Sequence, residues 1–225
     1  MFDITTHFYS IMILLSLIVN IIIAMLISKK YSVSKKEMIC LLLYENVGII
    51  GGAKLFTFIQ KYEELDGQFD FISLGLTAYG GIIGALLFLL LFSFQFKKSF
   101  KEILYIFMPS IPLMYGISKI GCYFASCCAG IEINTYIFPV QIIEAIVFIL
   151  IFIYMLAKHD KNQFDLKTLG ISAVLCGSSK FMLDYFRYSH IGIVLSFNQI
   201  ISIIVIIIGV IVIIFKKLLL QNTIH

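Results

Sequence analysis

Three lysines, Lys54, Lys119 and Lys180, lie inside long apolar stretches of this 225-residue sequence. A lysine in the hydrocarbon layer of a membrane costs about 2.5–3.5 kcal/mol, so such residues usually face a polar site within the protein. Cations in such a site favour an anionic ligand, and the simplest anion at a membrane is the phosphate of a phospholipid. These residues therefore predict an anion-binding site, provided that they come together.

The composition indicates a helical membrane protein. Hydrophobic residues make up 60% of the chain and charged residues 13%, and the mean hydropathy is +1.02, which excludes a soluble domain. A helix needs about 20 residues to cross the hydrocarbon layer. Seven stretches have roughly that length: about 8–28, 37–59, 77–96, 102–125, 137–157, 168–187 and 194–215. We expect an all-α polytopic membrane protein with seven transmembrane helices, forming a single domain over residues 1–225.

The charges of the connections predict the orientation of these helices. Lysines gather after the first, third, fifth and seventh stretches, at Lys29, Lys30, Lys35, Lys36, Lys97, Lys98, Lys101, Lys158, Lys161, Lys167, Lys216 and Lys217. The other connections are acidic or nearly neutral, with Glu63, Glu64, Asp66, Asp70 and Glu132. The positive-inside rule then places the N-terminus outside and the C-terminus in the cytoplasm. The net charge of +4 follows from this topology, so we expect no nucleic-acid partner.

This orientation places the buried charges at a similar depth. With a rise of about 1.5 Å per residue, Lys54, Lys119 and Lys180 all fall on the outer side of the membrane midplane. Further polar residues expected near this depth are Tyr79, Gln141, Glu144 and Arg187. Polar groups from several helices are therefore expected at a similar depth, on the outer side of the membrane midplane.

The spacing of Lys180, Asp184 and Arg187 is i, i+4, i+7, which predicts one stripe of a helix. Two simpler interpretations stay open. Lys180 and Asp184 would form an ion pair that joins helices, or Lys54 and Arg187 would extend to the lipid headgroups. The glycines that follow Tyr79, Gly80 and Gly81, predict close helix packing. They are also compatible with a backbone that approaches a lipid headgroup, and both interpretations can hold together.

Three cysteines, Cys122, Cys127 and Cys128, lie near the outer end of the fourth stretch. A zinc site would use four ligands at suitable spacing, and no paired histidines stand nearby in the sequence. A thiol-redox protein would normally carry Cys-x-x-Cys, which is absent here. We therefore favour small residues packed at a helix end, and expect neither a metal nor a cofactor.

The order of motifs along the chain resembles the prolipoprotein diacylglyceryl transferase family, bacterial membrane enzymes with seven helices. The resemblance covers roughly residues 9–217. Gly51-Gly52-Ala53-Lys54 is similar to the family's Gly-Gly-Arg or Gly-Ala-Arg stretch. Ala78-Tyr79-Gly80-Gly81-Ile82-Ile83-Gly84 is similar to its His-Gly-Gly-Leu-Ile-Gly.

Later motifs follow in the family's order. Ser118-Lys119-Ile120-Gly121-Cys122, closed by Gly130, resembles the signature that begins Gly-Arg-(Ile/Leu)-Gly-Asn. Pro139-Val140-Gln141-Ile142-Ile143-Glu144 resembles Pro-Ser-Gln-Leu-Tyr-Glu. The stretch from Lys180 to Arg187 matches an Arg-x-x-x-(Glu)-x-x-Arg stripe, and Ser196-Phe197-Asn198-Gln199 resembles Ser-Met-Gly-Gln.

The resemblance implies transfer of the diacylglyceryl group of phosphatidylglycerol to a cysteine thiol of a secreted preprotein at the outer face of the bacterial plasma membrane. Glycerol 1-phosphate leaves and a thioether forms. A thiol with an ordinary pKa near 8.5 must become a thiolate to attack carbon. The departing phosphate needs a cation to neutralise its developing charge. An anionic phospholipid and a peptide acceptor are therefore the expected partners.

The resemblance also assigns roles to residues of this chain. Lys119 and Lys180 stand where the family has its essential arginines, and Tyr79 stands where it has histidine, so these three are the expected catalytic residues. Lys54 also stands where the family has an arginine. A lysine keeps the positive charge but cannot form the two parallel hydrogen bonds of a guanidinium. The expected substrate-binding residues are Lys54, Gly80, Gly81, Cys122, Gly130, Gln141, Glu144, Asp184 and Arg187. Two alternatives stay open: a non-catalytic member that binds lipid or peptide, and a membrane thiol-redox protein that uses the cysteine cluster.

Overall fold

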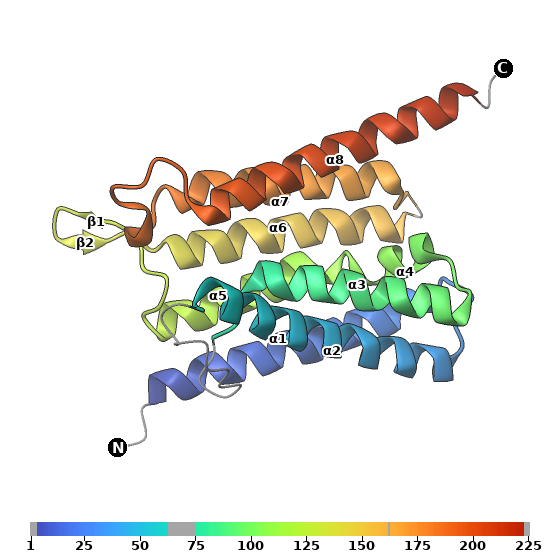
Figure 1. The fold of residues 1–225 in the computed structure, drawn as a ribbon, viewed down its shortest axis with the longest axis horizontal. Coiled ribbons are helices and arrows are strands. Elements are labelled where there is room, and N and C mark those ends of the chain that lie inside the picture. The colour runs from blue at the N-terminus through green and yellow to red at the C-terminus, as the bar shows by residue number, and fades with distance from the viewer. Residues whose placement is uncertain (1–3, 63–74, 162, 223–225) are drawn as a thin grey trace. The chain divides into compact units, whose positions relative to one another are not determined.

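The structure, a computed structural model, describes residues 4–62, 75–161 and 163–222 and is predominantly helical (Figure 1). Its elements are α1 (Ile4–Ser28), α2 (Lys35–Gln60), α3 (Ala78–Phe96), α4 (Phe100–Phe107), α5 (Ser110–Phe124), β1 (Glu132–Ile133), β2 (Tyr136–Ile137), α6 (Val140–Asp160), α7 (Leu166–Asp184), the 3-10 helix η1 (Tyr188–His190) and α8 (Phe197–Asn222). The acidic residues Glu63, Glu64, Asp66 and Asp70 lie outside the described residues.

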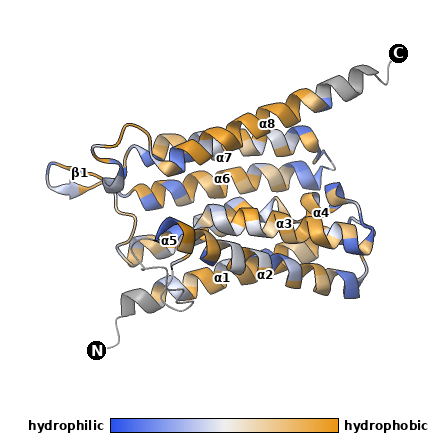
Figure 2. Ribbon diagram, viewed as in Figure 1, coloured by the Kyte–Doolittle hydropathy of each residue, from blue (hydrophilic) through white to orange (hydrophobic). Residues whose placement is uncertain are grey.

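The helical class predicted from the sequence is confirmed. Among the described residues, six helical segments are long and apolar enough to cross a membrane: Phe8–Ser28, Lys35–Gln60, Ala78–Phe96, Phe100–Phe124, Val140–Asp160 and Phe197–Lys216. Figure 2 shows hydrophobic residues along most of their length and hydrophilic residues gathered toward the helix ends. The chain is therefore a multi-pass membrane protein. The remaining predicted span, 168–187, corresponds to α7, which carries Lys167, Lys180 and Asp184, so seven crossings and their orientation stay predictions.

The chain forms two compact units. The first comprises the described parts of Met1–Asn20 and Met108–His225, and the second comprises the described parts of Ile21–Phe107. The single domain expected from the sequence stays a prediction. Each unit has packing of its own, which explains how its polar residues are positioned.

In the second unit, α2 and α3 pack through glycines. A Cβ atom on Gly52 would lie 2.3 Å from the carbonyl oxygen of Gly80, and one on Gly84 would lie 2.1 Å from that of Gly48. Such distances are impossible for side chains, so glycine is required for this close approach. The large apolar side chains of the same unit form a separate core with Leu41, Leu89, Phe92, Ile103, Ile106 and Phe107.

A capping box fixes the start of α2. The Ser34 hydroxyl accepts a hydrogen bond from the Glu37 amide at 3.3 Å, and the Glu37 carboxylate accepts one from the Ser34 amide at 2.9 Å. Both bonds satisfy amides that the first turn of a helix leaves without partners. Glu37 also pairs with Lys98 at 2.8 Å, which joins the start of α2 to the segment after α3.

In the first unit, α5 packs on α6, α6 on α7, and α7 on α8 (Figure 1). Glycines again allow close approach, because a Cβ atom on Gly177 would lie 2.9 Å from the Ser202 carbonyl oxygen. The predicted helix over 102–125 was wrong in one respect: it is divided into α4 and α5. The division falls at Pro109, which has no amide hydrogen to donate and disfavours helical geometry in the residue before it.

The end of the predicted helix over 168–187 also differs. α7 ends at Asp184, and Arg187 has an extended backbone before η1. The prediction that Arg187 shares a helical stripe with Lys180 was therefore wrong. A short hairpin, in which Glu132 pairs with Ile137 across β1 and β2, precedes α6 and projects beyond its start (Figure 1).

Candidate functional site

The first unit contains a buried carboxylate surrounded by cations. Glu144, in the second turn of α6, is fully buried, and each of the three cations beside it is at most 6% exposed. Lys180 Nζ donates to Glu144 Oε1 at 2.8 Å. Arg187 Nη2 lies 2.6 Å from Oε2, and Lys119 Nζ lies 3.4 Å from the same oxygen. The two sequence-predicted lysines of this unit thus meet at one carboxylate.

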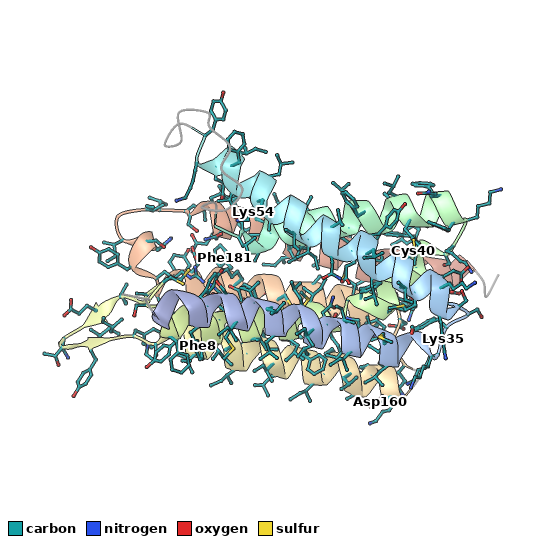
Figure 3. All side chains as sticks on the ribbon, turned by 90° about the horizontal axis from the view of Figure 1, so that it is seen from below. Phe8, Lys35, Cys40, Lys54, Asp160 and Phe181 are labelled. Carbon is teal, nitrogen blue, oxygen red and sulfur yellow. The ribbon has the colours of Figure 1, made fainter. Side chains whose placement is uncertain are left out.

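The direction of the helices explains this meeting. Lys119 lies in the last turns of α5, Glu144 near the start of α6, and Lys180 near the end of α7. Consecutive helices that run in opposite directions bring these positions to the same end of the unit. Phe181 and Phe8 lie toward that end, and Asp160 marks the other (Figure 3). The predicted convergence of Lys119, Lys180 and Glu144 in depth therefore extends to direct contact.

Arg187 reaches the same carboxylate from beyond the end of α7. Its Nη2 donates to both oxygens of Glu144, at 2.8 and 2.6 Å. The residue is 5% exposed, so the alternative that it extends to the lipid headgroups was wrong. Lys180 pairs with Glu144 at 2.8 Å, and Asp184 pairs with Arg187 instead, at 3.6 Å from its Nε.

Tyr115 also contacts this cluster and was not predicted from the sequence as a site residue. Its hydroxyl donates to Glu144 Oε1 at 3.2 Å. Lys119 Nζ lies 5.1 Å from the centre of its ring and Lys180 Nζ lies 5.4 Å from it, so both lysines are placed for cation–π contact. The available signal was spacing, because Tyr115 precedes Lys119 by one helical turn. An aromatic residue in an apolar stretch otherwise resembles ordinary packing.

Asp184 forms a second group of polar contacts next to the first. Its carboxylate accepts hydrogen bonds from the Ser196 hydroxyl and from Asn198 Nδ2, the latter at 3.5 Å. His190 Nδ1 lies 3.9 Å from the same carboxylate. Asp184 thus ties the segment after α7 to the start of α8. Ser196 and Asn198 belong to the stretch that resembles Ser-Met-Gly-Gln.

The charges of the cluster do not balance. Three cations, Lys119, Lys180 and Arg187, stand against two carboxylates, Glu144 and Asp184, which leaves a formal excess of one positive charge. In addition, the buried Nε of Arg187 has no hydrogen-bond partner among the described residues. Buried donors without partners are rare in folded proteins. A site with a formal excess of positive charge is suited to an anion.

Two further predicted residues position the loop beside the cluster. Gln141 Nε2 donates to the carbonyl oxygen of Cys127 at 2.9 Å. Gly130 forms an isolated antiparallel bridge with Arg187. A Cβ atom on Gly130 would lie 2.1 Å from the Phe138 carbonyl oxygen, so only glycine fits there. Both residues therefore support the backbone around the cations.

Cys122 is buried at the end of α5, and the structure brings it close to Cys127 and Cys128. Hydrogen bonding from the Cys122 and Cys127 thiols lowers the pKa of the Cys128 thiol, and the charges of Lys119 and Arg187 lower it further. The cysteine cluster therefore lies within electrostatic range of the cations of the site.

The remaining predicted residues belong to the second unit. Lys54 is half-buried on α2, toward the opposite end of that helix from Lys35 (Figure 3). Tyr79 is the second residue of α3 and is half-buried. Gly80 and Gly81 are buried where α3 faces α2, which confirms that they serve helix packing. That these four residues act together with the cation cluster stays a prediction.

The sequence model of the family described as prolipoprotein diacylglyceryl transferase matches residues 1–215. The chain belongs to this family. The match includes every residue of the cation cluster and all the predicted site residues.

Curated relatives at low identity carry the same family name. The chain is 28% identical over 192 residues to phosphatidylglycerol–prolipoprotein diacylglyceryl transferase 2 of Clostridium perfringens, covering 76% of this chain and 75% of the relative. It is 24% identical over 233 residues to the Clostridium tetani enzyme of that name, covering 94% of each. It is 25% identical over 237 residues to the Finegoldia magna enzyme, covering 98% of this chain and 96% of the relative.

Proposed function

We propose that the chain transfers the diacylglyceryl group of phosphatidylglycerol to a cysteine thiol of a secreted preprotein, at the outer face of a bacterial plasma membrane. The observation that carries the proposal is the meeting of Lys119, Lys180 and Arg187 around the buried Glu144. The names of the relatives supply the lipid and the preprotein.

The reaction requires one bond to form and one to break. The acceptor sulfur attacks the glycerol carbon that carries the phosphate and forms a carbon–sulfur bond. The carbon–oxygen bond to the phosphate breaks, and glycerol 1-phosphate leaves with the bonding electron pair. The thiol proton passes to a base, for which Tyr79 is our candidate by its match to the family's histidine. Tyr79 acts either as that base or as a hydrogen-bond partner of the thiol.

The cations contribute by stabilising the departing phosphate. Preorganised charges in a site that excludes water stabilise a developing anion far more than water does. We assign this role to Lys119 and Lys180, with Glu144 holding both lysines and Arg187 in place and Asp184 facing the Arg187 guanidinium. This assignment follows their contacts, since Glu144 contacts all three cations and Asp184 lies 3.6 Å from the arginine Nε. Lys54, Gly80, Gly81, Cys122, Gly130 and Gln141 complete the proposed substrate-binding set.

The experiment incubates the purified full-length protein with phosphatidylglycerol and a peptide that carries a lipobox cysteine. Mass spectrometry measures the peptide with its added diacylglyceryl group, and a coupled assay measures released glycerol phosphate. We expect both products in equal amounts. Absence of both, on this peptide and on other thiol acceptors, would overturn the transferase proposal.

Matched variants test the site. Lys119→Met and Lys180→Met remove a buried charge and keep most of the side-chain length, so each should reduce the transfer rate at least tenfold. Lys98→Met is the control, because Lys98 forms only a half-exposed pair with Glu37 at 2.8 Å. Lipid binding that depends on both lysines without any transfer would favour the non-catalytic alternative. Transfer that survives the double variant would refute the assignment of these lysines.

A further inference from the structure

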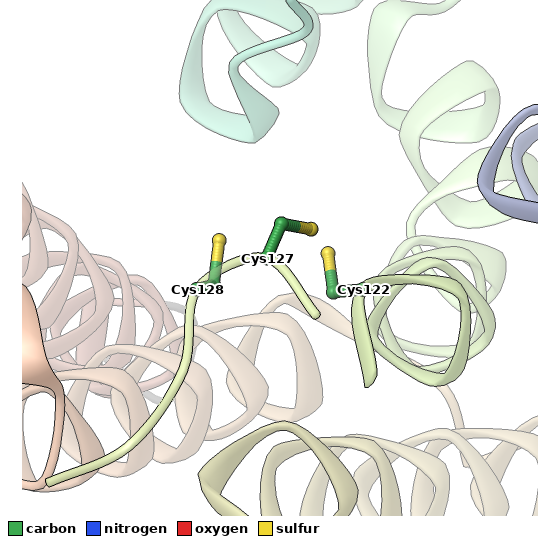
Figure 4. Close-up of side chains that lie close together, drawn as sticks. All are labelled: Cys122, Cys127 and Cys128. Carbon is green, nitrogen blue, oxygen red and sulfur yellow. The ribbon is translucent and has the colours of Figure 1, made fainter. Parts of the chain in front are cut away.

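Three cysteine thiols meet at the end of α5 and in the loop that follows it. The sulfur atoms of Cys122, Cys127 and Cys128 all lie within 4.8 Å of one another (Figure 4). Cys122 is buried, Cys127 is intermediate and Cys128 is exposed. Among the described residues, these three cysteines form the group of metal-ligating side chains that lie close together. Packing of small residues at a helix end, favoured from the sequence, does not require the three sulfur atoms to lie this close together.

The backbone of the loop holds the thiols in this arrangement. The Cys127 amide donates to the Cys122 carbonyl at 3.0 Å, and Gln141 donates to the Cys127 carbonyl at 2.9 Å. Ser126 and Cys128 both have left-handed backbones, with φ of 53° and 55°. That conformation is unfavourable for residues with a Cβ atom, so surrounding contacts must enforce it. The cluster is therefore part of the folded structure and not an accident of side-chain rotation.

The spacing of the sulfur atoms suits a metal ion. When three atoms lie within 4.8 Å of one another, some point lies within about 2.8 Å of all three. A zinc–thiolate bond is about 2.3 Å long, so small rotations of the side chains would complete the coordination. Thiolates are soft ligands that select ions such as Cu⁺ and Zn²⁺ over magnesium or calcium.

Two cations lie close to the thiols. Metal-bound cysteines are thiolates, and three thiolates around one ion leave excess negative charge. Lys119 and Arg187 lie close enough to Cys128 to act on it electrostatically, and Lys119 acts on Cys122 in the same way. These cations offset part of the excess negative charge that a thiolate cluster would carry.

We propose that Cys122, Cys127 and Cys128 bind one Cu⁺ ion through three thiolates. The group contains no histidine or carboxylate among the described residues, and Cu⁺ accepts three sulfur ligands. Zn²⁺ in structural sites is almost always four-coordinate and would need a ligand that the group lacks. The site lies next to the cation cluster but does not depend on the transferase proposal.

The test uses the full-length protein in detergent, reduced and kept free of oxygen. Cu⁺ is titrated against a chromogenic Cu⁺ chelator, and Zn²⁺ is titrated separately against a zinc indicator. We expect one equivalent of Cu⁺ per chain that withstands the chelator. Cys127→Ser and Cys128→Ser should weaken this binding at least tenfold. Cys40→Ser and Cys176→Ser, which change cysteines outside the group, should leave it unchanged.

A second measurement needs no variant. Cys128 is exposed and open to alkylation in the metal-free protein, and one equivalent of Cu⁺ should slow its modification at least tenfold, as mapped by peptide mass spectrometry. Several results would overturn the proposal: no stoichiometric Cu⁺ binding, binding unchanged in the triple serine variant, or stoichiometric binding of Zn²⁺ alone. A Cys122–Cys127 disulfide that forms in air, with no Cu⁺ binding after reduction, would assign the thiols to redox chemistry instead.

Discussion

Arg187 donates from one terminal nitrogen to both carboxylate oxygens of Glu144, at 2.8 and 2.6 Å, although it lies beyond the end of α7. The contact therefore joins a loop residue to a residue near the start of a different helix. Its neighbour Asp184, the last residue of α7, faces the Nε of the same guanidinium at 3.6 Å. Two carboxylates therefore fix the position of this arginine. Its place in the site does not follow from the helical spacing of Lys180, Asp184 and Arg187.

Glu144→Gln should destabilise the folded protein strongly. The substitution leaves Lys119, Lys180 and Arg187 buried together without the carboxylate that they face. Removing one partner of a buried ion pair typically costs about 3–5 kcal/mol, because the remaining charge is uncompensated. Thermal unfolding in detergent, followed by circular dichroism, measures the loss.

Two comparisons make this prediction specific. Glu132→Gln changes an exposed carboxylate on β1 and should leave the unfolding temperature nearly unchanged. Adding Lys180→Met to Glu144→Gln removes one of the uncompensated cations and should recover part of the lost stability. Equal effects of Glu144→Gln and Glu132→Gln, or a simple sum in the double variant, would contradict the proposed coupling.

Arg187→Lys keeps the positive charge but should still reduce the rate of diacylglyceryl transfer. Lysine has a single charged nitrogen, so it cannot contact Glu144 and face Asp184 as the guanidinium does through Nη2 and Nε. We expect at least a tenfold fall in the rate of diacylglyceryl transfer, which corresponds to about 1.4 kcal/mol. The rate is measured at saturating peptide with varied phosphatidylglycerol. A rate equal to wild type would show that charge alone matters at this position.

Tyr115 should contribute through both its hydroxyl and its ring. Tyr115→Phe removes the 3.2 Å hydrogen bond to Glu144 and keeps the ring near both lysines. Hydrogen bonds between helices in membranes are worth about 0.6–2 kcal/mol, so a loss in that range is expected. Tyr115→Leu also removes the cation–π contacts and should cost about 0.5–2 kcal/mol more. Unfolding temperatures of the two variants separate the contributions, and identical values would exclude a role for the ring.

Much of the fold could be predicted because hydropathy records helices of membrane-crossing length. The apolar runs and the helices agree to within a few residues at most ends, for example 37–59 against Lys35–Gln60. The break at Pro109 was missed because a two-residue turn does not lower the hydropathy of a long window. The β1–β2 hairpin was missed because strands of two residues carry no visible alternation.

The site could be predicted only in part. Lys119, Lys180 and Glu144 were found because charge in an apolar helix is costly and the topology gives its depth. The helical stripe assigned to Arg187 failed because spacing does not reveal where a helix ends. The contacts of Asp184 with Ser196 and Asn198 join α7 to the start of α8. Such contacts follow from tertiary packing, which no local pattern records.

Gly52→Ala and Gly51→Ala form a matched pair on α2. A Cβ atom on Gly52 would lie 2.3 Å from the Gly80 carbonyl oxygen, whereas one on Gly51 meets nothing within 4 Å. Gly52→Ala must therefore push α3 away, at a cost of about 1–3 kcal/mol. Gly51→Ala should be neutral or stabilise the helix by up to about 1 kcal/mol. The unfolding temperatures of the two variants in detergent should move in opposite directions or differ clearly. Equal values would refute the close packing of α2 on α3.

Gly130→Ala should displace Arg187 without changing any charge. The added Cβ atom would lie 2.1 Å from the Phe138 carbonyl oxygen and 3.1 Å from that of Phe186, and both are backbone atoms that cannot rotate away. The bridge between Gly130 and Arg187 must then open, which moves the arginine away from Glu144. We expect at least a tenfold loss of transfer, measured by lipidation of the peptide. Gly75→Ala is the control, because a Cβ atom there meets nothing within 4 Å. Full activity of Gly130→Ala would show that the loop adapts, and that its backbone does not hold Arg187 in the site.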